Sequence, residues 1–88
     1  MRKFNTLVSN ARQIIEQKYR EIVCFNEPHK CATRPVQMTT KELREVLLRH
    51  GDYIQIMASG QMWGCHIRHR SLGAGVYSVW LAFVVTKI

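Results

Sequence analysis

Acidic side chains are scarce in this chain and are missing from its C-terminal part. Among 88 residues, six Asp and Glu face thirteen Lys and Arg, which gives a formal net charge of +7 at pH 7. From residue 53 to residue 88 there is no acidic residue. Such an excess of positive charge favours a polyanionic partner, whether nucleic acid, an acidic membrane face or an acidic protein.

The sequence also lacks the usual signatures of catalysis. It contains no glycine-rich phosphate loop, no glycine-flanked nucleophile and no close pair of carboxylates. Four of the six acids fall at solvated positions of the helices predicted below: Glu16, Glu21, Glu42 and Glu45. A Cys–His dyad could be assembled from the cysteines and histidines of the chain, but no further signature of a nucleophilic enzyme accompanies them. The sequence therefore predicts a protein that is not an enzyme and has no cofactor.

Long hydrophobic runs are missing as well. The longest, from Val79 to Val85, is far shorter than the ~20 apolar residues that cross a bilayer. Arg2 and Lys3 lead directly into an amphipathic pattern rather than into a secretory leader. The three cysteines are an odd number, so disulfides cannot use them all. We expect a cytoplasmic protein with reduced thiols and no membrane contact.

Side chains that ligate metals are few and poorly spaced for a zinc site. They form two groups: Cys24, His29 and Cys31 in the first, and Cys65, His66 and His69 in the second. A structural zinc needs four converging ligands, commonly from pairs about two to four residues apart. Six residues separate Cys24 from Cys31, and Cys65 has the pattern of a buried strand position. No metal site is predicted, and metal binding by these thiols stays an open question.

Two helices are predicted from apolar spacing and capping chemistry. Apolar residues from Phe4 to Ile22 recur three and four positions apart, which is typical of a helix with one buried stripe. A second helix begins after Thr39, because Thr39 and Glu42 have the spacing of a capping box, and Gly51 supplies its stop. Between the helices, residues 24–37 contain two prolines and no periodicity, so we expect an ordered loop.

Three strands are predicted in the second half of the chain, at residues 53–59, 62–70 and 76–88, because each alternates in polarity. The last is apolar on both faces, as expected for a central strand with a helix on its odd-numbered face. The fold class is therefore α+β, one small domain over residues 1–88. Two helices pack on a three-stranded antiparallel sheet in the order ααβββ, with the C-terminal strand central.

A cationic strand is the leading candidate for a binding site. His66, Arg68 and Arg70 share one face of the 62–70 strand, about 6–7 Å apart, a spacing that suits consecutive phosphates. The loop adds Lys30 and Arg34, and Tyr53, Met57 or Trp80 would offer a stacking surface beside them. We expect a nucleic-acid-associated module. A helix-turn-helix is disfavoured because the loop between the two helices is long.

An acidic protein is the alternative partner for the same basic face. Arginines anchor protein interfaces as well as they bind phosphates, and composition alone does not separate the two ligands. The short length and the missing catalytic signature suit a small regulator or inhibitor, of the kind that mobile elements encode.

The even-numbered face of the last strand is the candidate oligomer interface. Trp80, Ala82 and Val84 make it more apolar than an exposed sheet requires. Two explanations stay open: a homodimer that buries this face, or cover from the 24–37 loop.

Overall fold

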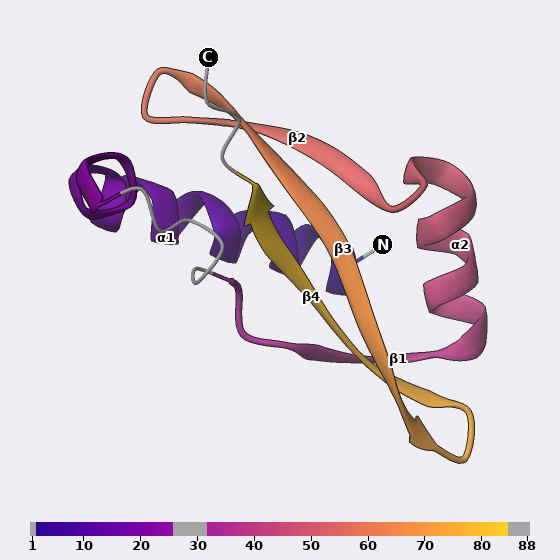
Figure 1. Ribbon diagram of the computed structural model, residues 1–88. Coiled ribbons are helices and arrows are strands. Elements are labelled where there is room, and N and C mark those ends of the chain that lie inside the picture. The colour runs from indigo at the N-terminus through magenta and orange to yellow at the C-terminus, as the bar shows by residue number, and fades with distance from the viewer. Residues whose placement is uncertain (1, 26–31, 85–88) are drawn as a thin grey trace.

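The computed structural model describes residues 2–25 and 32–84, with side chains from residues 2–20 and 32–84. Two helices and four strands follow one another along the chain (Figure 1): α1 (Arg2–Phe25), β1 (Val36–Thr39), α2 (Thr40–His50), β2 (Tyr53–Ala58), β3 (Gln61–Gly73) and β4 (Val76–Val84). The predicted α+β class with two helices is confirmed. The sheet has four strands, so the prediction of three is wrong.

The additional strand, β1, lies within the segment that we expected to be a loop. Its four residues pair antiparallel with the start of β4, from Val36 opposite Val79 to Thr39 opposite Val76. The sheet order is β1-β4-β3-β2, with every pairing antiparallel. This order makes β4 an interior strand, as its two apolar faces predicted. β1 escaped prediction because four residues between Pro35 and a helix cap are too few to show alternation.

The segment just before β1 continues along the same edge of β4. Ala32 forms a bridge with Ala82, and the backbone N–H of Thr33 donates to the Leu81 carbonyl at 2.9 Å. The Leu81 N–H in turn donates to the Thr33 side-chain oxygen at 2.9 Å, and Thr33 is buried. Residues 32–39 therefore lie beside β4, in the sheet, and not across the face that bears Trp80.

Both helices pack on one face of the sheet. The apolar stripe of α1 is buried there, with Leu7, Ala11 and Ile15 fully inaccessible to solvent. Opposite it, β4 contributes its odd-numbered side chains, as predicted; the buried ones are Val79, Leu81 and Phe83. The helix departs from regular geometry at Lys18 (φ −119°, ψ 17°) and continues to Phe25. Beyond that point, Tyr19 meets the buried Trp63 edge-on, with ring centroids 5.9 Å apart.

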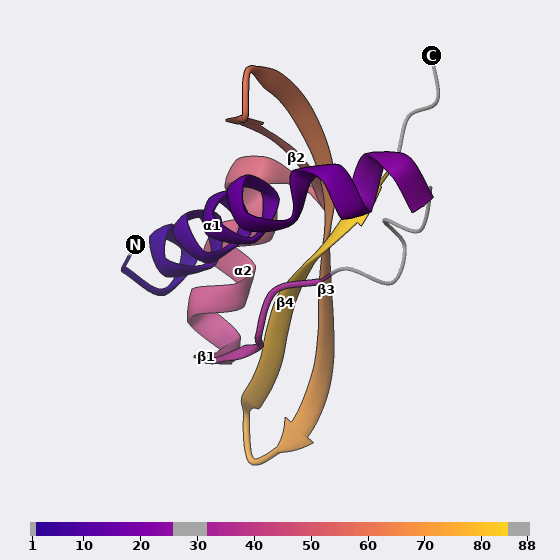
Figure 2. The same ribbon diagram turned by 90° about the vertical axis from the view of Figure 1, so that its left-hand side faces the viewer.

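The opposite face of the sheet, called the outer face below, carries neither helix. In Figure 2, α2 and the first part of α1 lie on the same side of β3 and β4. β3 and β4 form a long twisted hairpin, longer than predicted, because the expected 71–75 linker is largely strand. Its turn has positive φ at Gly73, Ala74 and Gly75. The outer face is consequently a continuous surface built by β2, β3 and β4.

The predicted capping box at the start of α2 is confirmed. The Glu42 N–H donates to Thr39 Oγ1 at 3.2 Å, and the Thr39 N–H donates to Glu42 Oε1 at 2.9 Å. Lys3 of α1 adds an ion pair with the same carboxylate oxygen at 3.1 Å. At the other end, Gly51 donates to the Leu47 carbonyl at 2.8 Å with φ 69°. Gly51 therefore ends the helix as predicted, although its ψ of −148° places it outside the left-handed helical region that is common at helix C-termini.

Glu42 gives the fold a predictable response to acid. The backbone N–H of Thr39, and after it Lys3, hold the pKa of this carboxyl below its ordinary value. Because the folded pKa is depressed, the stabilisation is present above the unfolded pKa, about 4.3, and is lost as the pH falls through the folded pKa. Glu42→Gln should therefore flatten the pH dependence of unfolding on the acid side of about pH 5, as measured by urea denaturation at several pH values.

Glu45→Gln is the matched control for that experiment, because it removes the same charge from the same helix without touching the cap. If both variants flattened the curve equally, the cap would not be the origin of the effect.

Candidate functional site

The outer face contains a row of cationic side chains along β3. His66, Arg68 and Arg70 point to this face, as predicted, while Trp63, Cys65 and Ile67 are buried toward the helices. The neighbouring positions on β4 are Ala82 opposite His66, Trp80 opposite Arg68, and Ser78 opposite Arg70. Arg68 and Trp80 are therefore direct cross-strand neighbours on one surface, a pairing in which side chains lie about 4.5–5.5 Å apart at Cβ.

No carboxylate among the described side chains forms an ion pair with this row. Arg68 and Arg70 are exposed and His66 is half-buried. Among the residues whose side chains the structure describes, the only ion pair is Lys3–Glu42, which lies with the helices. β2, β3 and β4 contain no acidic residue, so within the described part of the chain these strands place only basic and neutral side chains on the outer face.

The Tyr53 ring packs flat on the outer face because the residue beneath it, Gly64, has no side chain. It pairs with His66 across β2 and β3, with the two rings edge to face and their centroids 5.6 Å apart. The far end of its ring lies directly over Gly64, where a Cβ atom would collide with the Tyr53 hydroxyl and its carbon. The ring therefore lies along the sheet, and 39% of the residue remains exposed. We did not predict this contact from the sequence, although a glycine inside a strand beside an aromatic residue is its recognisable signal.

The end of the outer face near the β2–β3 turn is apolar. Met57 and Met62 are paired there and are each 54% exposed. Trp80, Ala82 and Val84 follow along β4 and are half-buried. Because residues 32–39 run beside β4, they do not cover this face. Residues 26–31 lie outside the described part, so the choice between loop cover and a homodimer stays open for that segment.

Sedimentation tests the homodimer prediction. Each large apolar side chain buried across a two-fold axis contributes roughly 1.5–3 kcal/mol, so a few of them would hold a dimer. If the Trp80 face is buried in a homodimer and is therefore closed to other ligands, the chain should sediment as a dimer at micromolar concentration, and Trp80→Glu should return it to a monomer. A monomer mass that Trp80→Glu leaves unchanged would contradict the dimer.

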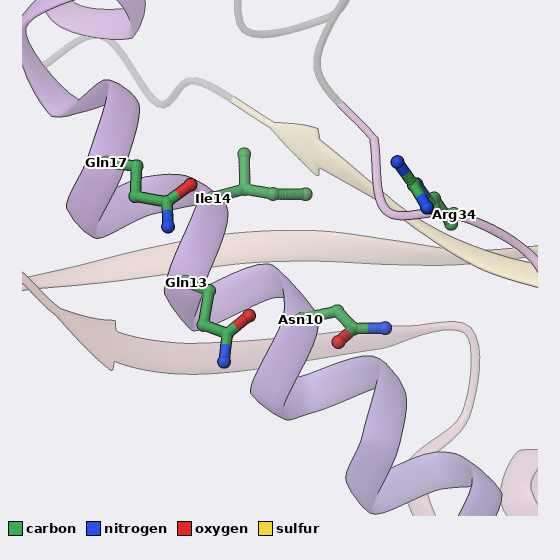
Figure 3. A pocket seen from close by; sticks show the side chains of 5 residues that line it. All are labelled: Asn10, Gln13, Ile14, Gln17 and Arg34. Atoms are coloured by element: carbon green, nitrogen blue, oxygen red, sulfur yellow. The ribbon is translucent and has the colours of Figure 1, made fainter.

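Arg34, the other described cation of the predicted site, lies elsewhere. It faces α1 across a cleft of about 360 Å³, lined by Arg34 together with Asn10, Gln13, Ile14 and Gln17 (Figure 3). Because α1 covers the sheet face opposite to Arg68 and Arg70, Arg34 does not join their row. Lys30 lies outside the described residues. The structure thus brings together His66, Arg68 and Arg70, and it adds Trp80 and Tyr53 beside them.

A second, largely apolar cleft of about 350 Å³ lies between α2 and the β3–β4 hairpin. Its lining comprises Thr40, Leu43, Arg44, Leu47, Leu48, His69 and Tyr77. His69 and Tyr77 meet edge to face at 6.0 Å, and Leu48 is 80% exposed. This cleft lies on the helix side, so His69 is turned away from the cationic row even though it follows Arg68 in the chain.

The thiol that sequence analysis placed in the core is buried there. Cys65 is inaccessible to solvent, and burial raises its pKa to about 12, so the group is a neutral thiol rather than a nucleophile at neutral pH. Cys24, His29 and Cys31 lie outside the residues with described side chains. Within the described side chains, no three His, Cys, Asp or Glu residues converge on a point that would suit a metal ion.

Comparison of the chain with protein families, curated proteins and solved structures gives no match. Neither α1 nor α2 has the length and apolar character that a helical membrane crossing requires.

Proposed function

We propose that this protein is a non-enzymatic nucleic-acid-binding module that uses the outer face of its sheet. The observation that carries the proposal is the exposed pair Arg68 and Arg70, aligned beside Trp80 on a sheet face without acidic residues. This arrangement combines the two elements of sequence-tolerant binding, which are cations for phosphates and an aromatic surface for bases.

The phosphates account for the affinity in this proposal. Arg68 and Arg70 are two residues apart on a strand, so their guanidinium groups leave the backbone about 6–7 Å apart, within reach of successive phosphates. Binding then releases condensed counterions, and the logarithm of the affinity falls linearly with the logarithm of the salt concentration. The interaction is tolerant of sequence, because phosphate contacts carry no base information.

Fluorescence anisotropy with labelled oligonucleotides tests this proposal. Between about 50 and 200 mM salt, the slope of log affinity against log salt should be about −0.7 to −0.9 for each phosphate contact. Retention should be similar for oligonucleotides of different sequence. If neither DNA nor RNA is retained at low salt, the proposal is wrong.

An acidic protein is the second candidate ligand, and the exposed pair Met57–Met62 is the observation that favours it. Methionine and arginine together are enriched at protein interfaces, where aromatic residues also gather. A pull-down from nuclease-treated extract separates the two candidates. A stoichiometric protein partner that survives nuclease and is lost in Arg68→Ala would favour the acidic protein, whereas loss of all bound material after nuclease would favour nucleic acid.

A further inference from the structure

We infer that the ligand is a single-stranded nucleic acid, with one base stacked on Trp80 and another on Tyr53, and the backbone between them over the β3 cations. This inference rests on the proposed function and adds the class of nucleic acid and the position of its bases.

The two aromatic side chains lie on either side of the cationic row. Trp80 of β4 is opposite Arg68, and Tyr53 of β2 is opposite His66, so β3 runs between them. Neighbouring strands are about 4.7–4.9 Å apart, which separates the two aromatic residues by about 10 Å across the sheet. Along the sheet they are offset by the two residues from His66 to Arg68, about 6–7 Å. A backbone that follows β3 is then within reach of both rings through its bases.

Small residues lie beside both aromatic side chains, of which Tyr53 is 39% exposed and Trp80 is half-buried. Ala82 lies between Trp80 and Val84 on the outer side of β4, and Gly64 lies beneath the Tyr53 ring. Without a side chain at Gly64, the Tyr53 ring rests on the strand and exposes its other surface. Base stacking requires such an open ring face, and it accepts any base because every base has a π-surface.

A duplex does not fit the same surface. Its bases are stacked on one another, so Trp80 and Tyr53 would meet only the sugar-phosphate backbone or groove edges. The protruding end of the β3–β4 hairpin is the part whose shape suits a groove. That end consists of Ser71, Leu72, Gly73, Ala74 and Gly75, which include no cation and no side-chain amide. The hairpin end therefore lacks the bidentate arginine, lysine and amide contacts that most often read base edges in a groove.

Tryptophan emission provides the test, because the chain has two tryptophans and Trp63 is buried in the core. In Trp63→Phe, Trp80 is the sole tryptophan. Titration with oligo-dT and oligo-U should quench its emission, while a hairpin duplex of the same charge should leave it largely unchanged and bind at least about tenfold more weakly. Quenching by either oligonucleotide supports the inference, and a difference in affinity between the two shows whether DNA or RNA is preferred.

Trp63→Phe removes a buried hydrogen bond, because the Trp63 indole N–H donates to the Ala58 carbonyl at 3.0 Å. A second set of variants tests the inference if that variant does not fold. Trp80→Leu and Tyr53→Leu, in the otherwise native chain, should each lower single-strand affinity in anisotropy about five- to hundredfold, and Trp80→Phe should retain most of it. Equal binding of duplex and single strand, with the leucine variants unaffected, would overturn the inference and leave the proposed function in place. Binding of neither would overturn the proposed function itself.

Discussion

Replacing Arg68 and Arg70 together by alanine is expected to lower the affinity for nucleic acid on the order of tenfold or more at moderate salt. Both guanidinium groups are exposed on the outer face, and neither forms an ion pair with a carboxylate in the part of the chain that the structure describes. Losing two phosphate contacts should also make the salt slope shallower by about 1.4 to 1.8 in the anisotropy titration. The loss should be similar for most sequences, because these contacts do not read bases.

The control for that variant is Arg44→Ala with Arg49→Ala. These two arginines are exposed on α2, on the helix side of the sheet, and their removal changes the net charge by the same amount. Neither double variant should change the free energy of unfolding by more than about 0.5 kcal/mol for each substitution, because surface side chains without partners contribute little. If the α2 variant lost as much affinity as the β3 variant, net charge alone would explain binding and the outer face would not be the site.

Leu81→Ala is expected to destabilise the fold by about 2–5 kcal/mol, the range for a leucine truncated in a packed core. Leu81 is fully inaccessible to solvent on the helix side of β4. Its backbone carbonyl and its N–H both form hydrogen bonds with Thr33. A chain of this length is stable by only about 4–13 kcal/mol, so the variant should unfold at much lower urea concentration.

Trp80→Ala is the informative neighbour of that substitution. Trp80 precedes Leu81 on the same strand but points to the outer face, where it is half-buried. Trp80→Ala should therefore lower the free energy of unfolding less than Leu81→Ala does, and it should lower the affinity for nucleic acid more. The opposite order of stabilities would mean that the outer face is covered and Trp80 is a core residue.

Periodicity and capping chemistry were sufficient to predict most of the fold. The stripe of α1, the Thr39–Glu42 box and the alternation of β2 and β3 each depend on residues close in sequence, so the pattern that forms the element is visible along the chain. The orientation of His66, Arg68 and Arg70 followed from the same alternation.

The parts that escaped prediction depend on residues far apart in sequence. β1 forms because residues 36–39 pair with β4, about forty residues later in the chain. Four residues are too few to show a periodic pattern of their own. Arg34 is two residues before Val36 in that edge segment and so turns toward α1, which separates it from Arg68 and Arg70. The packing of the Tyr53 ring over Gly64 depends on the register between β2 and β3.

The most direct test of binding by the outer face is an NMR titration of the two indole N–H groups with oligo-dT. We expect the Trp80 indole resonance to shift or broaden as the oligonucleotide is added, together with the side-chain N–H resonances of Arg68 and Arg70. The Trp63 resonance should stay in place, because Trp63 is buried on the helix side and its indole N–H is bonded to Ala58. Perturbations confined to α1 and α2, with the Trp80 indole unchanged at saturation, would contradict the account.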